Sequence, residues 1–347
     1  MIPYIGGKQR MAPWIHSFIP DNIGTYVEVF GGAFWVYMKS DLDNPLASKQ
    51  HIYNDFNPYM VNLYRCASSP KQFSKFIDTK DVPLQSGSDK RPLDECRQYF
   101  NQCKEDMFAT TFAIKKLREV LEDKSIVKKE RKSLNEALEF VRNRRVEINN
   151  DIRDKFGEKI KTGKKDQMAA MQYVYLLTNC FSGASAVEAT FTDDSKKNSS
   201  KFAAFHKKLN DEDNIRRLKN ITVCENLSFE QVIEKYDSPH TYFYCDPPYW
   251  NTEGYYSLHG FGRDQHFQLK DCLHNMQGMF SLSYYDFPEL SGMYPPNEFK
   301  WEKKEFVKAS GAKEGQAQSI GQELLIMNYI LPRDLPNNNV LEALLSA

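Results

Sequence analysis

An acid, two prolines and an aromatic residue follow one another directly in the stretch YFYCDPPYW at 242–250. The apolar run before the acid predicts a buried strand that ends at Asp246. Consecutive prolines fix the backbone φ angle and leave carbonyl oxygens with no N–H group between them. Asp246, Pro247, Pro248 and Tyr249 therefore form a rigid row of hydrogen-bond acceptors beside an aromatic ring, which suits a planar amine.

The amino group of a nucleobase is a poor nucleophile because its lone pair is delocalised into the ring. If the Asp246 carboxylate accepts one N–H and the Pro247 carbonyl accepts the other, the nitrogen becomes more tetrahedral and its lone pair is freed. Tyr249 would hold the base by stacking. We interpret the turn as a preorganised site for an attacking amine. The alternative is a proline-rich turn in which the acid is incidental.

Two further strand ends carry residues that suit a ligand. In VEVFGGAF (27–34), Gly31 and Gly32 allow the backbone to approach a ligand closely, and Glu28 can bind its amino or hydroxyl group. In YNDFN, Asp55 stands where an acid grips the ribose hydroxyls of nucleoside cofactors. Each has a structural alternative: an ordinary Gly-Gly turn for the first, and a cap for the helix after Pro58 for the second.

Strand and helix patterns alternate through most of the chain, as in an α/β domain. Amphipathic runs such as PYMVNLYR and FEQVIEKY predict helices between the strands. The predicted strands are TYVEVF (25–30), HIYND (51–55), ITVCE (221–225), YFYC (242–245), MFSLSYY (279–285) and ELLIMNYIL (323–331). We expect a mostly parallel sheet with ligands beyond the carboxyl ends of its strands. The segment 309–321, rich in small residues, is predicted to be a mobile loop.

Residues 91–165 interrupt this alternation. No Gly or Pro occurs between Pro92 and Gly157, and helix formers dominate. Between 115 and 165 there are 17 Lys or Arg and 10 Asp or Glu, a surplus of positive charge in a chain of zero net charge. The surplus indicates either a solvated helical face or a surface that contacts phosphates. We predict a helical insertion for target recognition, built as an αα-hairpin.

The insertion divides one α/β catalytic domain into 1–90 and 166–335, and residues 336–347 form a tail. The seven cysteines have no C-x-x-C spacing, so the sequence predicts no metal site and no disulfide framework. No run approaches 18 apolar residues, and the N-terminal MIPYIGGKQR lacks the apolar segment that secretion needs. We therefore expect a cytoplasmic protein with no membrane contact.

With these motifs in place, the sequence resembles the Dam-like adenine-N6 DNA methyltransferases over most of residues 1–331. The resemblance implies a Rossmann-like methyltransferase sheet, S-adenosylmethionine as cofactor and double-stranded DNA as partner, for a monomer or a dimer. Residues 246–249 match the family's D-P-P-Y catalytic motif, and SLSYYD (281–286) is similar to the strand that follows it. The resemblance assigns to the cofactor Tyr4, Gly6, Gly7, Lys8, Glu28, Phe30, Gly31, Gly32, Asp55 and Asp246.

Candidate DNA contacts come from three places. The segment YLLTNCFSG (175–183) looks like the one at which the family begins its DNA contacts, which makes Asn179 a candidate. Arg142, Arg144 and Arg145 lie in the basic insertion, where they would contact phosphates. His266, shortly after the D-P-P-Y motif, is either a DNA contact or a satisfied surface histidine at the start of a helix.

The sequence departs from the family's F-x-G-x-G cofactor loop at one position, where Phe34 replaces the last glycine. This change favours an alternative in which the chain is a catalytically silent DNA-binding subunit with a methyltransferase fold. A second alternative is methylation of another amine, such as cytosine N4, an adenine of RNA or a protein amide. The acid at position 246 favours adenine, since the resemblance associates Ser or Asn with the other amines.

Overall fold

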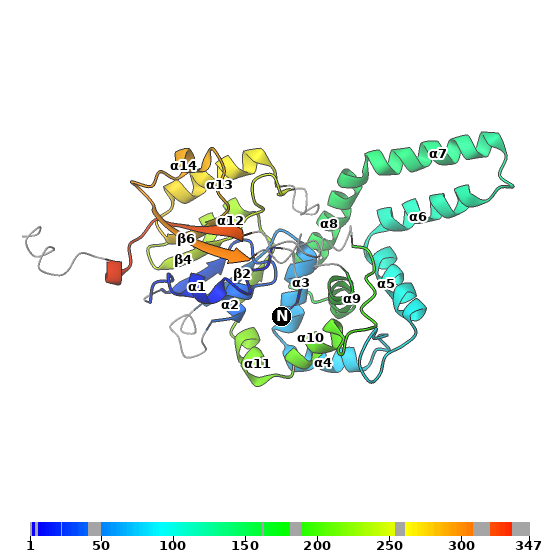
Figure 1. Cartoon of the computed structure of the whole chain (residues 1–347), viewed down its shortest axis with the longest axis horizontal. Helices are drawn as coiled ribbons and strands as arrows, with labels where there is room; N and C mark the ends of the chain where they lie inside the picture. The colour runs from blue at the N-terminus through cyan, green and yellow to red at the C-terminus, as the bar shows by residue number, and fades with distance from the viewer. Residues whose placement is uncertain are drawn as a thin grey trace, which may run out of the picture.

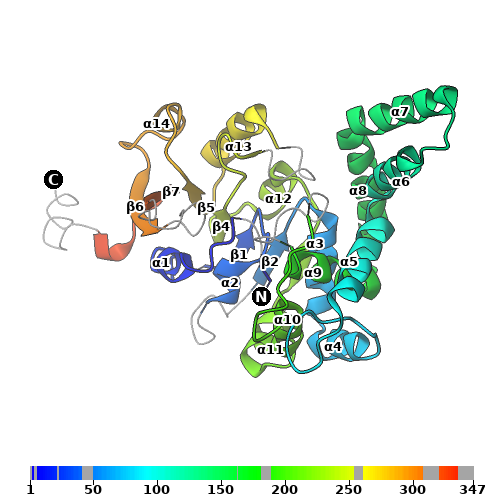
Figure 2. The ribbon, with the colours of Figure 1, turned by 45° about the vertical axis from the view of Figure 1, so that its right-hand side comes forward.

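The computed structural model describes residues 2–3, 6–21, 23–40, 50–161, 163–180, 189–253, 261–307 and 320–334. Within these ranges the chain forms a seven-stranded sheet flanked by helices on both faces, and a helical arm that extends away from the sheet (Figures 1 and 2). No helix in these ranges has the length and the apolar character that crossing a membrane requires.

The sheet has the strand order β3-β2-β1-β4-β5-β7-β6. β1 to β5 run parallel to one another, whereas β7 is antiparallel to both β5 and β6. The strands are β1 (Thr25–Glu28), β2 (Gln50–Asn54), β3 (Val223–Glu225), β4 (Thr241–Cys245), β5 (Met279–Tyr284), β6 (Lys300–Val307) and β7 (Ile320–Met327). The prediction of an α/β fold with a mostly parallel sheet is confirmed.

Helices connect the strands and form the insertion. They are α1 (Ala12–His16), α2 (Trp35–Met38), α3 (Pro58–Ala67), α4 (Pro70–Asp78), α5 (Leu93–Met107), α6 (Ala109–Glu122), α7 (Lys128–Asn143), α8 (Arg145–Lys161), α9 (Gln167–Thr178), α10 (Lys201–Lys208), α11 (Glu212–Lys219), α12 (Phe229–Tyr236), α13 (Arg263–Asn275), α14 (Leu290–Met293) and the 3-10 turn Pro332–Asp334.

Alternate residues of the strands enter two separate hydrophobic cores, as the two-residue period of a strand requires. Tyr26, Tyr242 and Tyr244 belong to a core shared with α1, α2, α3 and α9. Val27 and Phe243 belong to a second core on the opposite face, shared with α12, α13 and α14. The sheet is therefore held from both sides, and its strand ends are fixed relative to each other.

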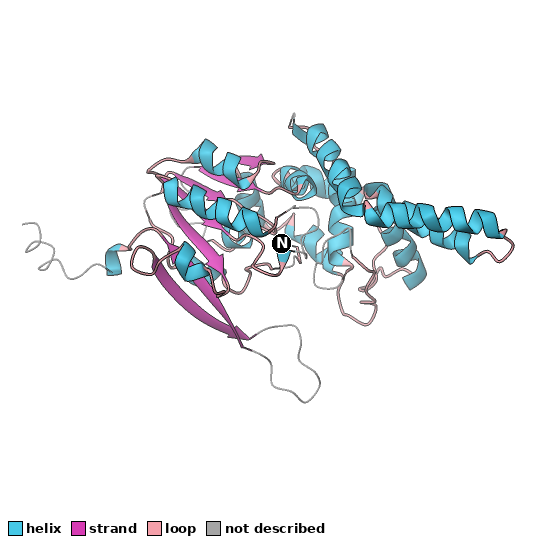
Figure 3. Cartoon of the chain, turned by 90° about the horizontal axis from the view of Figure 1, so that it is seen from above, coloured by secondary structure: helices cyan, strands magenta, loops and turns pink. Residues whose placement is uncertain are grey.

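The segment 93–161 contains α5 to α8. α6 and α7 pack against each other and project from the body of the protein as a long arm (Figure 3). α8 returns from the arm and packs against α3, and α5 packs against α9. The backbone leaves the helical conformation at Arg144, so α7 ends there and α8 begins as a separate helix at Arg145. The division into domains stays a prediction.

β6 is the strand that the sequence did not predict. Its residues KWEKKEFV are mostly charged, because it is an edge strand, and edge strands often carry Lys on their open side. The predicted loop 309–321 lies outside the described residues, except for its last two residues, which begin β7.

Candidate active site

Three acids stand at the carboxyl edge of the parallel strands. Glu28 ends β1, Asp55 follows β2 directly, and Asp246 follows β4 directly. β1 pairs in parallel with β2 and with β4, and Glu28 lies opposite Tyr53 and Tyr244, so these strand ends are adjacent. The winding of the chain also reverses between β1 and β4, and a crevice for ligands forms at such a point in an α/β sheet.

A pocket opens at this edge. Its walls come from the N-terminal segment, the bend after β1, the turn after β2 and the end of β4. It is lined by Gly6, Gly7, Lys8, Glu28, Phe30, Gly31, Gly32, Ala33, Phe34, Trp35, Val36, Asp55, Phe56, Tyr244, Asp246 and Pro248. All the residues expected at the cofactor therefore line one pocket, apart from Tyr4, which lies outside the described residues.

The bend after β1 needs glycine for two different reasons. A Cβ atom on Gly31 would stand 2.4 Å from the Tyr53 ring and 2.7 Å from the Asn54 carbonyl oxygen, where no side chain fits. Gly32 has a φ of 46°, in the left-handed region that favours glycine. The Gly32 N–H donates to the Asp55 carboxylate at 2.7 Å, and the Tyr53 hydroxyl donates to the Gly32 carbonyl at 2.9 Å. The bend is thus held by backbone and side chain together.

Asp55 is not the cap of the helix that follows. The cap of α3 is Asn57, whose side-chain oxygen accepts the Tyr59 N–H at 3.1 Å, with Pro58 at the first helical position. Asp55 instead accepts the N–H groups of Gly32 and Asn57, each at 2.7 Å. Its carboxylate thereby ties the turn after β2 to the glycine bend.

Phe34 keeps the backbone shape that a glycine would adopt. Its φ is 55° and its ψ is 34°, which is left-handed, and this costs a residue with a side chain roughly 1 to 3 kcal/mol. The ring is fully buried and lies 4.5, 5.0 and 5.6 Å from the rings of Tyr37, Tyr53 and Tyr64. Aromatic pairs contribute about 0.5 to 1.5 kcal/mol each, so these contacts offset the backbone strain.

The carboxyl group of Glu28 is buried with neutral partners. It accepts hydrogen bonds from the Tyr26 hydroxyl and the Tyr37 N–H, both at 2.7 Å. Burial raises the pKa of Glu28 to about 8, although these two hydrogen bonds oppose the shift and nearby Asp246 adds to it. Among the described residues no cation pairs with Glu28, so the pocket presents an acid that suits a positively charged ligand group.

The side chains around the D-P-P-Y turn form a compact charged cluster. The Lys8 ammonium nitrogen lies 2.9 Å from an Asp246 oxygen and 3.5 Å from a Glu323 oxygen. The same nitrogen lies 4.7 Å from the centre of the Tyr249 ring, over its face. The Tyr249 hydroxyl donates to the Glu323 carboxylate. Pro247 and Pro248 are also buried, and Pro248 lines the pocket.

Burial and charge act in opposite directions on these two acids. Burial raises the pKa of Asp246 and of Glu323, whereas the Lys8 ammonium lowers both. A carboxylate must be ionised to accept an N–H with both oxygens. Lys8 therefore helps Asp246 to keep the charge that an acceptor for an amine needs.

His266 does not lie on the surface. Its side chain is 0% exposed, bonded to the Tyr284 hydroxyl at 2.6 Å and to Glu253 at 3.1 Å, and surrounded by the rings of Trp250 and Phe261. Burial lowers the pKa of His266, although Glu253 raises it. The alternative of a surface histidine at the start of a helix is therefore wrong, and a direct contact with DNA does not fit a buried side chain. The histidine instead packs α13 against the turn that follows Tyr249.

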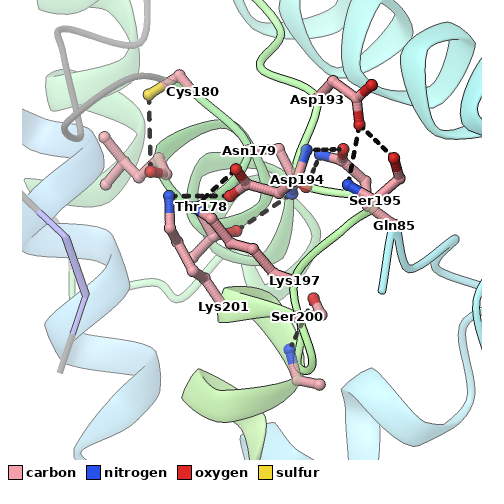
Figure 4. Close-up of polar contacts among 12 residues, drawn as sticks. Gln85, Thr178, Asn179, Cys180, Asp193, Asp194, Ser195, Lys197, Ser200 and Lys201 are labelled. Atoms are coloured by element: carbon pink, nitrogen blue, oxygen red, sulfur yellow. Dashed lines mark hydrogen bonds and ion pairs between the residues drawn. The ribbon is translucent and has the colours of Figure 1, made fainter. Parts of the chain in front are cut away.

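Asn179 also turns inward. The Gln85 side-chain amide donates to the Asn179 side-chain oxygen at 2.6 Å (Figure 4). The Asn179 amide donates to the Tyr175 carbonyl at 2.8 Å. Gln85 also accepts the Asp194 N–H at 2.9 Å. Asn179 is only 5% exposed, so a direct contact with DNA does not fit this arrangement. Its role is to join the end of α9 to the segment around Asp194.

The three predicted arginines lie where the arm joins α8. Arg142 and Arg144 are exposed. Arg144 forms an ion pair with Glu147, which lies three residues later, in the first turn of α8. Arg145 begins α8, but its side chain lies outside the described part. These residues are far along the chain from the pocket lining, so their contact with DNA stays a prediction.

Glu323 is the residue of this site that the sequence did not predict. It is 2% exposed and lies on β7. In the sequence, Glu323 directly precedes the apolar run LLIM, which indicates that it is buried. A buried charge needs a partner of opposite charge or a hydrogen bond. The sequence contains the acid, but only the pairing of β7 with β5 shows which partners it has.

The doubly wound sheet, with an acid-lined pocket at its switch point, is typical of α/β proteins that bind a nucleoside cofactor. Residues 4–308 match the model of the D12 class N6 adenine-specific DNA methyltransferases, and the chain belongs to this family. The family transfers a methyl group to adenine in DNA and uses S-adenosylmethionine. Among curated proteins, none matches the chain.

Proposed function

We propose that this chain methylates the N6 amino group of adenine in duplex DNA, and that Asp246, Pro247, Pro248 and Tyr249 form the slot for the target base. The supporting observation is that the Asp246 carboxylate lines the same pocket as the glycine bend at 31–32. A cofactor held at the bend and an amine held at Asp246 would then be neighbours. Such proximity contributes much of the rate in transfer reactions.

The residues of the pocket fit S-adenosylmethionine. Glu28, buried without a cation among the described residues, would hold the amino group of the cofactor, and Asp55 would hold its ribose hydroxyls. The bend at Gly31 lets the backbone approach, and the Phe30 ring lines the pocket where it would contact a positive charge. When bound, S-adenosylmethionine supplies an electrophilic methyl group.

The chain's own groups would prepare the target nitrogen. Asp246 and the Pro247 carbonyl would each accept an N–H of the amino group, which orients its lone pair. The nitrogen would gain the methyl group as the bond between the cofactor's sulfur and its methyl carbon breaks, and the proton that the nitrogen then loses would pass to solvent. Asp246 would act by orienting the amine and by stabilising the positive charge on nitrogen. Tyr249 would stack on the flipped base, which offsets an unstacking cost of a few kcal/mol.

Duplex DNA would lie between the α/β body and the helical arm. The basic segment 115–165 includes most of the arm and also α8, and the arm projects away from the α/β body (Figure 1). Contacts from Lys and Arg to phosphates would position the duplex without reading its sequence. Arg142, Arg144 and Arg145 are the residues that we propose for this role. A cytoplasmic location, and a monomer or a dimer, remain predictions from the sequence.

The alternative of a silent subunit rested on Phe34. Its backbone takes the left-handed conformation of the glycine that it replaces, and its ring is buried among tyrosines. The shape of the bend is thus kept, which supports an active enzyme.

The direct test uses methyl-labelled S-adenosylmethionine with unmethylated plasmid DNA, followed by digestion and nucleoside analysis. We expect label on N6-methyladenine from the wild type, and none above background from Asp246→Ala, because the amine loses its main acceptor. Circular dichroism and thermal unfolding check that the variant is folded. Label on cytosine, RNA or protein only, or cofactor binding with no transfer by the wild type, would contradict the proposal.

A further inference from the structure

Glu323 lies outside the residues that match the family, yet its carboxyl group is at the centre of the site. β7 runs antiparallel to β5, with Leu324 opposite Tyr284, the last residue of β5. The start of β7 therefore lies at the carboxyl edge of the parallel strands. Glu323, one residue before Leu324, is placed beside the turn that follows β4.

The Tyr249 ring makes two kinds of contact: ring–ring contacts, which do not fix its orientation closely, and one hydrogen bond, which does. The ring of Tyr285 lies 4.5 Å away at 74°, and that of Tyr284 lies 5.7 Å away, and such apolar contacts allow the ring to turn and slide. The hydrogen bond from the Tyr249 hydroxyl to Glu323 fixes the far end of the ring. A charged acceptor makes this bond roughly twice as strong as a neutral one.

The charge of Glu323 is tolerated because Lys8 lies 3.5 Å from it. Burying an acid without a partner is costly, so a buried acid bonded to an aromatic hydroxyl and close to a cation has a defined orientation. Lys8 also stands 2.9 Å from Asp246. The two carboxylates therefore share one cation, and the Tyr249 hydroxyl is bonded to one of them.

We propose that Glu323 is a positioning residue: it holds the Tyr249 ring, through the ring's hydroxyl, at the angle required to stack on the target adenine. The proposal rests on the proposed role of Tyr249 in the target slot. Glu323 is not among the residues that line the pocket proposed for the cofactor. Its loss should therefore reduce the rate of methyl transfer and leave cofactor affinity unchanged.

Two variants separate the hydrogen bond from simple packing. Glu323→Met keeps the length of the side chain but removes the acceptor, whereas Glu323→Gln retains an oxygen that can accept from Tyr249. We expect Glu323→Met to lower kcat roughly 10- to 100-fold, the cost typical of removing a group that orients another. Glu323→Gln should recover part of this loss. The cofactor Kd, measured by calorimetry, should change less than about twofold in both.

Tyr249→Phe provides the decisive comparison because it keeps the ring and removes the hydroxyl. If Glu323 acts through that hydroxyl, Glu323→Met should have little further effect on kcat in a Tyr249→Phe background. Fully additive losses would overturn the proposal, and so would wild-type kcat in folded Glu323→Met. If Glu323→Met fails to fold, Glu323→Gln combined with Tyr249→Phe gives the same comparison.

The matched control is Glu305→Gln, an exposed acid on β6 that lies opposite the neighbour of Glu323, Gln322. It should keep wild-type kcat and thermal stability. Absence of methyl transfer by the wild type would contradict the proposed function itself. Transfer by the wild type with an undiminished rate in Glu323→Met would contradict only the positioning role.

Discussion

Glu28, at the end of β1, forms hydrogen bonds within the fold and also lines the pocket proposed for the cofactor. Its carboxyl group is almost fully buried, bonded to Tyr26 and Tyr37, and it faces the pocket. The sequence predicted its place near the glycines, because Glu28 lies two residues before the end of the apolar run that precedes them. The shift of its pKa was not predictable, because it depends on which groups surround it.

Glu28 should make the free energy of unfolding depend on pH. Burial raises its pKa from 4.5 to about 8, so the folded state retains a proton that the unfolded state has lost. The stabilisation is complete below about pH 4.5, falls as pH rises, and is lost above about pH 8. It amounts to a few kcal/mol, at about 1.4 kcal/mol per pKa unit.

Urea denaturation of the ligand-free protein from pH 5 to pH 9 measures this effect. Compared with Glu28→Gln, the wild type should lose stability as pH rises towards 8, and the difference between the two proteins should be constant above that value. Parallel curves throughout the range would show that Glu28 carries no such shift.

At the scale of elements, prediction worked where apolar patterns are strong. The parallel strands have buried faces on both sides, so their apolar runs are easily recognised. β6 is an edge strand with many charges, and it escaped recognition for that reason. The break between α7 and α8 was also missed, because neither Gly nor Pro marks it.

If the arm contacts phosphates, the affinity for duplex DNA should depend on salt concentration through its basic residues. Arg142 is exposed near the end of α7, where it would contact a phosphate. Arg142→Gln should weaken binding to duplexes of any sequence to a similar extent. It should also reduce the slope of log K against log salt concentration by about 0.9, which corresponds to one phosphate contact.

Fluorescence anisotropy at several salt concentrations provides the measurement. Lys219→Gln, at an exposed position on α11, is the control of equal charge change and should leave the slope unchanged. An unchanged slope in Arg142→Gln would place the DNA elsewhere on the protein. Equal reductions in both variants would indicate a general effect of net charge.

At the scale of the whole molecule, the pocket is built from segments widely separated in sequence. Lys8 of the N-terminal segment, Asp55 after β2 and Asp246 after β4 line one pocket, and Glu323 on β7 joins this group through Lys8. Asp55 and Asp246 were predicted because the strand order of α/β proteins places such ends together. Lys8 was expected only from the resemblance to the methyltransferase family. Glu323 was not, since its position depends on an antiparallel strand at the far end of the chain.

A ligand that joins these segments should stabilise the entire fold. At a concentration 100 times its Kd, S-adenosylmethionine should add about 2.7 kcal/mol to the free energy of unfolding. In Asp55→Asn the same cofactor concentration should increase the free energy of unfolding clearly less, because the proposed contact with the ribose is weakened. Asp271→Asn, at an exposed position on α13, should match the wild type.

Denaturant titrations with and without cofactor compare the three proteins. If the cofactor increases the free energy of unfolding of Asp55→Asn as much as that of the wild type, a contact between Asp55 and the cofactor is excluded. No gain in the wild type would exclude binding to the folded chain at this concentration.

The left-handed turn at Phe34 also bears on how this sequence can change during evolution. A glycine holds such a turn by itself, and its neighbours are then free to vary. Here three tyrosines compensate for the side chain at position 34. Phe34 and these three tyrosines should therefore covary among related sequences. Relatives with glycine at position 34 should more often have other residues at the three tyrosine positions.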